Sequence, residues 1–331
     1  MRHLRRKLLF NSFIVSIVFV LAGACNPEHD IDLDQIPIET KLQRFDLAFF
    51  ETDTTDFESE LQKLQAQYPP FFSSKSELIF WENQRRDPLQ LELFEKVQAV
   101  FGDMAAYELE LSNILKRYYY YFGIEDSIKA YSYISRLDFN FPVVFAPPYL
   151  FLATDLYLGE PGQKFYAPLP QYLQFERQPS FLLRDAAYAL AESKVPKPAE
   201  PQSFLDAMLY HGKLLWLTER LIPSIIEAGL LKYPQAKFDF SLAHEKEMWV
   251  YFIENELLFK SDQETQRRFL EVAPFSKFRT QIDQETPGRI GQWFGYKVFS
   301  EYAASADDIS LNALLREMDS RKVLKLSGYK P

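Results

Sequence analysis

The spacing of apolar and polar positions predicts many helices and a few short strands. Residues 38–45 alternate apolar and polar side chains, which is typical of a half-buried strand. Apolar runs on either side of Pro147-Pro148 predict two more strands, at 136–145 and 149–157. Helical spacing predicts helices at 57–67, 89–101, 104–121, 180–193, 203–217, 241–258, 287–304 and after Ser310. The pattern indicates a predominantly helical α+β fold with a small sheet in the N-terminal half.

Residues that favour helix starts support several of these boundaries. Ser203 and Ser310 suit N-cap positions, and Pro287 suits the first turn of a helix. The sequence contains no internal repeat and no low-complexity linker. Its Pro-rich stretch at 195–202 is short and falls between two predicted helices. We therefore expect residues 37–331 to form a single domain.

The N-terminal segment predicts export and lipid attachment. Basic residues precede an apolar run at 8–21, which suits a signal peptide better than a membrane span. Small residues then lead into Cys25, the one cysteine of the chain, in an arrangement that resembles a lipobox. We predict a signal peptide at 1–24, diacylglycerol and an N-acyl chain on Cys25, and an acidic tether at 25–36. An ordinary signal peptide with a free thiol and a true membrane span are the alternatives.

Charge and composition narrow the range of partners. The formal net charge is −9, and removal of the four basic residues of the leader makes it −13. Such an acidic protein is not expected to bind nucleic acid or to dock electrostatically on anionic lipid. Aromatic residues make up 16% of the chain, enough to fill a substantial core and also to line a groove.

Two histidines of the body lie in predicted helices and raise the question of a zinc site. His244 and Glu245 begin like the zinc-protease motif H-E-x-x-H, but Met248 stands where the second histidine belongs. A thioether is a poor zinc ligand beside imidazole, so we interpret this match as chance. His211 is followed by Gly212 and Leu215, which occupy the places of the general base and the second ligand.

One other combination of residues could form a metal site. A catalytic zinc needs three protein ligands, and His211 and His244 could combine with Glu245 or Glu247 across two packed helices. For nucleophilic or phosphate chemistry, the sequence contains neither G-x-S-x-G nor a Gly-rich phosphate loop. We expect no metal and no cofactor other than the lipid on Cys25.

Three glycines near the C-terminus recur at a helical spacing. Gly288, Gly291 and Gly295 fall on one face of the predicted helix at 287–304. Each glycine weakens a helix by up to about 1 kcal/mol, so their presence implies that a backbone or a ligand approaches this face closely. Close packing of another backbone is the interpretation that we favour.

Short segments along the mature chain form a recognisable series. The most specific are APFSKF at 273–278 and TPGRIGQWFGY at 286–296. The others are RFD at 44–46, YPPFF at 68–72, DPLQLELF at 87–94, TDLYLG at 154–159, LPQYL at 169–173, HGKLLWL at 211–217, ENELLFKSD at 254–262 and GYKP at 328–331. In this order, the segments resemble the GldB family, the gliding-motility-associated lipoproteins of Bacteroidetes.

The resemblance implies an envelope lipoprotein that supports gliding, with partners in the gliding and type IX secretion machinery. It also implies a degenerate zincin-like domain, similar to a zinc metallopeptidase whose active helix has eroded. On this basis 211–215 occupies the place of H-E-x-x-H, and 245–251 lies where relatives carry a glutamate ligand. Gly212 and Leu215 depart from that pattern, so we expect a pseudo-metallopeptidase without catalysis.

These expectations lead to a binding hypothesis. The protein is exported across the inner membrane, held to a membrane by its lipid, and binds another envelope protein or peptide in the former substrate groove. A sheet edge at 149–157 could add an extended partner segment as a strand. The residues predicted to line the groove are Asp155, Tyr157, His211, Lys213, Glu247, Arg289 and Trp293. The alternative is an envelope zinc metallopeptidase with an unconventional site.

Overall fold

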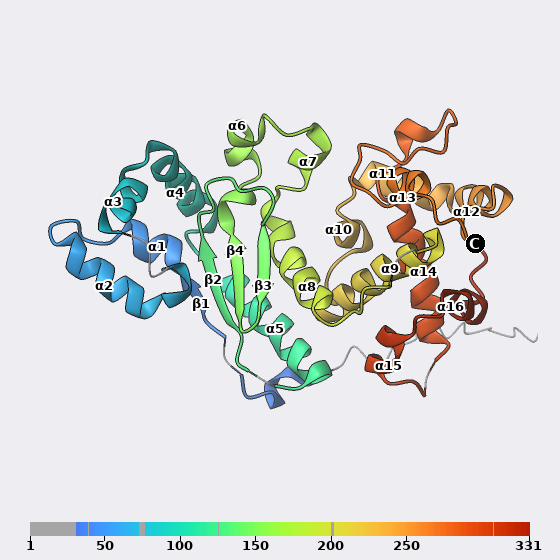
Figure 1. Cartoon of the computed structure of the whole chain (residues 1–331), viewed down its shortest axis with the longest axis horizontal. Coiled ribbons are helices and arrows are strands. Elements are labelled where there is room, and N and C mark those ends of the chain that lie inside the picture. Colours follow the sequence, from blue (N-terminus) through green and yellow to red (C-terminus); the bar gives the residue numbers. More distant parts are fainter. Residues whose placement is uncertain (1–30, 39, 73–76, 125, 200–201, 307) are drawn as a thin grey trace, which may run out of the picture. The chain divides into compact units, whose positions relative to one another are not determined.

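The computed structural model describes residues 31–331 except 39, 73–76, 125, 200–201 and 307. Asp32–Pro331 forms one compact unit, drawn in Figure 1. The predicted signal peptide and Cys25 lie outside the described residues. Among the residues that are described, none of the helices has the length and apolar character needed to cross a bilayer.

A small sheet occupies the N-terminal half, as the sequence predicted, and it has four strands where three were expected. Its strands are β1 (Leu42–Arg44), β2 (Lys129–Tyr133), β3 (Val143–Ala146) and β4 (Tyr149–Ala153), in the order β1-β2-β4-β3. The first three strands of that order run parallel, and β3 is antiparallel to β4. Because β4 lies between β2 and β3, the prediction of an open edge at 149–157 is wrong. The sequence pattern missed β2, which takes the neighbouring place.

The two faces of the sheet bury different side chains. One face presents aromatic residues of β2 and β4 to α1 (Phe45–Phe50), α2 (Phe57–Gln67) and α3 (Leu78–Arg86). The other face, with Ala130, Leu150 and Leu152, packs on the helices α4 (Pro88–Phe101), α5 (Ala105–Phe122) and α8 (Leu182–Glu192). Figure 1 shows α8 beside β3, between the sheet and the C-terminal helices.

The C-terminal helices gather around α9 (Phe204–Leu221) and α14 (Ile290–Ala304). Ser203 caps α9 as predicted: its hydroxyl accepts the Asp206 N–H while the Asp206 carboxylate accepts the Ser203 N–H. The other helices of this half are α10 (Glu227–Leu231), α11 (Gln235–Ala243), α12 (Glu245–Glu254), α13 (Gln263–Phe269), α15 (Leu311–Arg316) and α16 (Ser320–Ser327). In the sequence, the short helices α6 (Gln163–Tyr166) and α7 (Gln171–Phe175) come between β4 and α8.

Two expected helices differ in their bounds. The predicted helix at 241–258 is broken at His244, which ends α11 and begins α12. The predicted helix at 287–304 begins later, because Arg289 is its N-cap in the left-handed region at φ 61° and Pro287 lies before it.

Glycines bring the backbones of α9 and α14 into contact, which confirms the packing interpretation. A Cβ on Gly212 would lie 2.2 Å from the Gly295 carbonyl oxygen, and one on Gly295 would lie 1.9 Å from that of Met208. On Gly291 a Cβ would meet the Phe269 carbonyl oxygen at 2.9 Å. Gly288 precedes the helix and lies against the backbone of Ala273. Larger residues at 212 or 295 would force the two helices apart.

We predict that Gly212→Ala destabilises the protein by about 1–3 kcal/mol, because the added methyl overpacks the α9–α14 contact. Chemical denaturation of the full chain in detergent measures the loss. Gly229→Ala on α10 is the matched control, since its Cβ would meet only the side chains of Ile225 and Ile226, at 3.6 and 3.5 Å. That variant should be as stable as the parent or slightly more stable. Equal loss in both variants would contradict the prediction.

Candidate binding site

A buried carboxylate joins α8 to the sheet and to the end of α10. Asp185 accepts a hydrogen bond from the Tyr157 hydroxyl at 2.6 Å. The same carboxylate pairs with Lys232 at 2.6 Å and with the neighbouring Arg184 at 2.9 Å. Burial alone would raise the pKa of Asp185, but the charges of Lys232 and Arg184 outweigh it and hold that pKa at about 2. Asp185 is therefore ionised at neutral pH.

A second buried carboxylate extends this arrangement to α14. Glu176, just after α7, accepts from the Arg289 guanidinium at 2.6 Å. Its other oxygen lies 3.6 Å from the Lys232 ammonium. Lys232 thus links the two carboxylates. We call Glu176, Arg184, Asp185, Lys232 and Arg289 the charged cluster.

The two cationic residues beside Glu176 both have a left-handed backbone conformation. Lys232 has φ 53° and Arg289 has φ 61°, in the left-handed region that costs a residue with a Cβ roughly 1 kcal/mol or more. Lys232 ends α10 in this conformation, and Arg289 begins α14 in it. The surrounding structure holds both side chains toward one carboxylate despite this cost.

The loop before α14 explains how Arg289 is held. The Ser276 hydroxyl accepts the Ile290 N–H at 3.1 Å, and the Ser276 N–H donates to the Pro287 carbonyl at 3.0 Å. The Thr286 hydroxyl donates to the Ser276 carbonyl at 3.1 Å. Lys237 of α11 donates to the carbonyl of Thr286 at 2.8 Å and to those of Pro274 and Gln284. The APFSKF and TPGRIGQW segments therefore form one interlocked support for the start of α14.

Two neutral polar groups near Arg289 lack partners. The His211 Nδ1 and the Tyr233 hydroxyl are buried and have no hydrogen-bond partner among the described residues. Burial, reinforced by the charges of Arg289 and Lys197, lowers the pKa of His211 to about 4. Burial also raises the pKa of Tyr233, although the nearby charge of Arg289 acts to lower it. At neutral pH the imidazole is uncharged and the phenol keeps its proton.

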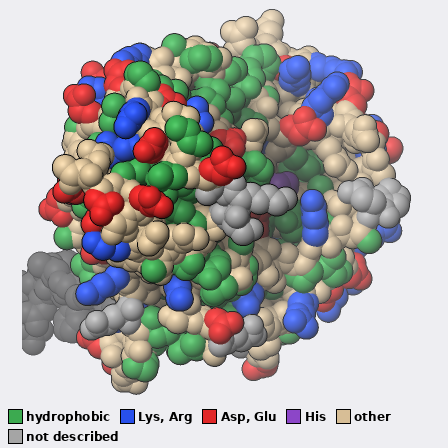
Figure 2. Space-filling model, turned by 60° about the vertical axis from the view of Figure 1, so that its left-hand side comes forward, with side chains coloured by type: hydrophobic (Ala, Val, Ile, Leu, Met, Phe, Trp, Pro, Cys, Tyr) green, Lys and Arg blue, Asp and Glu red, His purple; other side chains and the backbone are tan. Residues whose placement is uncertain are grey.

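The surface is hollowed near a histidine. Figure 2 shows a depression in which a histidine side chain is visible beside hydrophobic and basic side chains. The Arg289 side chain keeps 17% of its surface exposed, and His211 is half-buried, so solvent reaches both. The Arg289 end of the charged cluster is thus open to solvent, whereas its other side chains are only 9–11% exposed.

The structure brings together three of the residues predicted to line a groove and separates the rest. Tyr157, His211 and Arg289 meet at the charged cluster. Asp155 is fully buried and accepts hydrogen bonds from the N–H groups of Ser135 and Leu137, which shapes the loop after β2. Burial raises the pKa of Asp155 to about 6 despite these bonds.

Trp293 and Glu247 also lie away from the charged cluster. Trp293 is fully buried and donates from its indole nitrogen to Glu227 at 2.7 Å. Glu247 is exposed on α12. Asp155 and Trp293 therefore serve the core and do not line an open groove.

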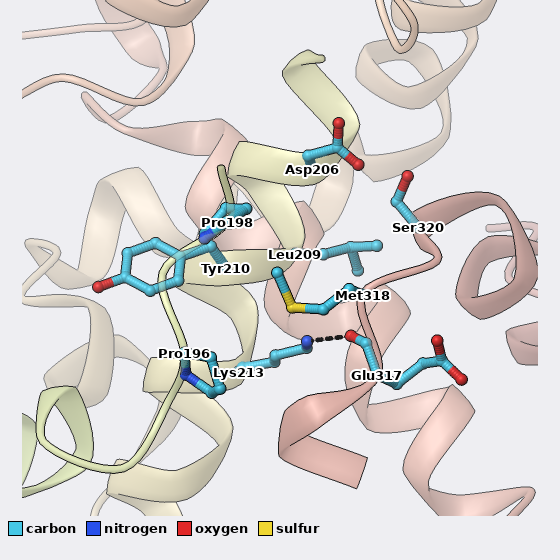
Figure 3. Close-up of a pocket in the computed structure, with 9 residues that line it drawn as sticks. All are labelled: Pro196, Pro198, Asp206, Leu209, Tyr210, Lys213, Glu317, Met318 and Ser320. Atoms are coloured by element: carbon cyan, nitrogen blue, oxygen red, sulfur yellow. Dashed lines mark hydrogen bonds between the residues drawn. The ribbon is translucent and has the colours of Figure 1, made fainter. Parts of the chain in front are cut away.

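Lys213 fastens α15 to α9. Its ammonium donates to the Leu315 carbonyl at 3.1 Å and to the Glu317 carbonyl, as Figure 3 shows for Glu317. Burial lowers the pKa of Lys213 to about 8. The small pocket beside it is lined by Pro196, Pro198, Asp206, Leu209, Tyr210, Lys213, Glu317, Met318 and Ser320. The Lys213 ammonium thus donates to main-chain carbonyls that join α15 to α9.

The alternative zinc ligands do not converge. The His244 ring packs against Phe240 at a tilt of 36°, with ring centres 4.3 Å apart. Glu245 accepts from the Tyr329 hydroxyl and lies 3.7 Å from Lys297. Over the described part of the chain, no three His, Cys, Asp or Glu side chains form a group that could hold a metal ion. The set His211, His244 and Glu245 is therefore not assembled in this fold.

Sequence reasoning missed most of the charged cluster. Glu176, Asp185 and Lys232 come from separate segments, and no motif links them. One signal was available: Arg184 and Asp185 interrupt the apolar stripe of α8 formed by Leu182 and Ala186. Charged residues at such positions indicate buried pairing.

We predict that Asp185→Asn destabilises the full chain by about 3–5 kcal/mol, because it leaves Lys232 and Arg184 buried without their shared carboxylate. Asp87→Asn is the control: Asp87 pairs at 3.2 Å with Arg136, whose side chain is 50% exposed. Asparagine also serves as an N-cap for α4, so this change should cost less than about 1 kcal/mol. Denaturation curves of both variants in detergent measure the two changes in the free energy of unfolding. Comparable losses of stability in Asp185→Asn and Asp87→Asn would contradict a buried ion pair at Asp185.

The lowered pKa of His211 gives a dependence on pH. Its folded pKa is about 4, whereas an unfolded histidine titrates near pH 6.5. Between these values the unfolded chain binds a proton that the folded chain does not, so stability falls as pH drops from 6.5 toward 4. His211→Gln should lose less stability than the parent over this range. An NMR titration of the His211 ring with a midpoint near 6.5 would contradict the prediction.

Comparisons with known proteins identify the family to which the chain belongs. Neither the curated proteins nor the solved structures gave a match. The family model described as gliding motility protein GldB matches residues 26–331. The match contains the whole charged cluster and the interlocked loop before α14. The zincin-like resemblance stays a prediction. The chain belongs to the GldB family of gliding motility lipoproteins.

Proposed function

We propose that this protein is a lipid-anchored component of the gliding apparatus in the cell envelope, where it binds another envelope protein or peptide without catalysis. The observation that carries the absence of catalysis is the position of Gly212. In a zinc protease the residue after the first histidine of the motif is the general base. Here that position faces the backbone of α14, where not even a Cβ fits.

The position of the second histidine in the motif also supports the absence of catalysis. Leu215, in the place of the second histidine, is 1% exposed and belongs to the C-terminal core. A base at 212 could not be restored without moving α14, and a ligand at 215 would have to replace a buried core side chain. That leaves His211 as the one residue of the motif, and a single imidazole cannot hold a catalytic zinc.

The charged cluster supports a role in recognition. Its ions are paired and held by packed elements, so its side chains are already positioned before a partner arrives. Buried arginines and tyrosines of this kind are common at the centres of protein interfaces. Partners in the type IX secretion and gliding machinery fit the family to which the chain belongs.

Crosslinking in intact cells tests the proposal. A photo-crosslinking amino acid at Lys197, whose charge acts on His211, should capture one envelope protein in a gliding strain. The same amino acid at Leu109, 66% exposed on α5, is the control and should not capture it. A strain whose only copy carries Cys25→Ala should release the protein from the membrane, lose this crosslink and stop spreading.

Three results would overturn the proposal or a part of it. Stoichiometric zinc in the purified full chain, lost in His211→Ala, would establish the metallopeptidase alternative. Normal gliding by a Cys25→Ala strain whose protein stays membrane-bound would refute the lipid anchor. Equal capture at Lys197 and Leu109 would refute a binding surface at the charged cluster.

A further inference from the structure

We infer that His211, Tyr233 and Arg289 form a receptor for one carboxylate group of the bound protein or peptide. This inference rests on the proposed function, because it assigns a chemical group to the partner proposed there. It also adds a prediction of its own, since a carboxylate is either recognised by the isolated protein or not.

The balance of charge points to an anion. The charged cluster holds three cations, Arg184, Lys232 and Arg289, against the two carboxylates Glu176 and Asp185. One positive charge is thus in excess in a region shielded from water, where an uncompensated charge is costly. An incoming group with a single negative charge would neutralise it.

Neighbouring charged groups do not remove this excess. Glu192 and Lys197 both lie at the exposed rim, and Lys197 offsets Glu192. Arg177, which is buried and lies over the Phe139 ring, adds a further positive charge near Tyr157. The surroundings of Arg289 therefore remain positive overall.

Unused hydrogen-bonding groups point to the same ligand. The Tyr233 hydroxyl belongs to a side chain only 5% exposed, and it has no partner among the described residues. The same is true of the His211 Nδ1, which one tautomer of a neutral imidazole would present as an N–H. A carboxylate accepts several hydrogen bonds and donates none, so it can satisfy both groups.

Arg289 supplies the charge for this receptor. One of its terminal nitrogens binds Glu176, and a guanidinium carries five N–H donors in a planar fork. Glu176 is also approached by Lys232, which reduces the repulsion that it would exert on a second carboxylate. The interlocked loop at 273–289 fixes the origin of the side chain, so the donors are oriented before binding.

A carboxylate fits better than a phosphate or a metal ion. The excess within the charged cluster is one charge, and Arg177 lies by Tyr157 rather than among the three groups of the receptor. A phosphate group would bring a charge of about −2 at neutral pH. A metal ion would need several acidic or imidazole ligands, and the described residues offer no such group of three. The carboxylate can come from the C-terminus of the partner or from one of its Asp or Glu side chains.

Binding of model carboxylates to the full chain in detergent tests the inference. The chain has four histidines, so labelling histidine alone gives few NMR signals, and the His211 signal is identified by its loss in His211→Gln. N-acetyl-tetraalanine, which has a free C-terminus, and N-acetyl-glutamate N-methylamide represent the two sources. We expect at least one of them to shift the His211 signal saturably, and which of them does so identifies the source. N-acetyl-tetraalanine amide should not shift it.

Two variants locate the site. Tyr233→Phe removes only the unpartnered hydroxyl, so the fold should be as stable as before while the dissociation constant rises about tenfold, the effect of one hydrogen bond to a charged group. Arg289→Gly removes the charge and suits the left-handed backbone, and should abolish the shift. Arg136→Gly is the matched control, because Arg136 has φ 62° but pairs with Asp87 away from the charged cluster.

Several outcomes would overturn the inference. They are no saturable shift with either carboxylate, equal binding of the amide, tighter binding of inorganic phosphate, and equal losses in Arg289→Gly and Arg136→Gly. Unchanged affinity in Tyr233→Phe would also count against it. These measurements use purified protein, so their failure leaves the crosslinking result intact, whereas a failed crosslink at Lys197 would refute the proposed function even if carboxylates bind.

Discussion

The direct contact between the backbones of α9 and α14 constrains the whole C-terminal half. Gly212 meets Gly295 where no side chain fits, so the separation of the two helices is fixed by main-chain atoms. Trp216 and Phe299 then pack edge to face one turn further along, with ring centres 5.3 Å apart. With this pair fixed, His211 of α9 lies near enough to Arg289, at the start of α14, for the charge of Arg289 to act on it. The site thus depends on two residues that contribute no side chain.

The charged cluster also connects the two halves of the protein. Tyr157 follows β4, while Arg184 and Asp185 belong to α8, which packs on the sheet and on α9. Lys232 and Arg289 come from the helices beyond α9. Buried ion pairs add little net stability compared with apolar packing, but they are costly to break. Such a cluster therefore favours a single relative placement of the sheet and the helical half.

The sequence was informative where structure is set locally. Apolar spacing and caps located α2 at 57–67 and the N-cap of α9 at Ser203, because neighbouring residues decide both. The pattern did not identify β2, whose buried Ser132 gives its hydrogen bond to Asp46, far away in the sequence. It also joined α11 to α12, since nothing near His244 signals a break. Of the site, only Tyr157, His211 and Arg289 were anticipated. Their partners at Glu176, Asp185 and Lys232 are brought close by tertiary contacts that no local pattern encodes.

The unsatisfied hydroxyl of Tyr233 has a consequence for kinetics. A polar group that loses its water during folding, without gaining a partner, leaves a local frustration in the free protein. A ligand arriving there does not have to strip water from that group, so part of the usual dehydration barrier is absent from the encounter. Once the hydrogen bond has formed, dissociation must leave the group unpaired again. Selectivity at such a position is expressed mainly in how long a partner remains bound.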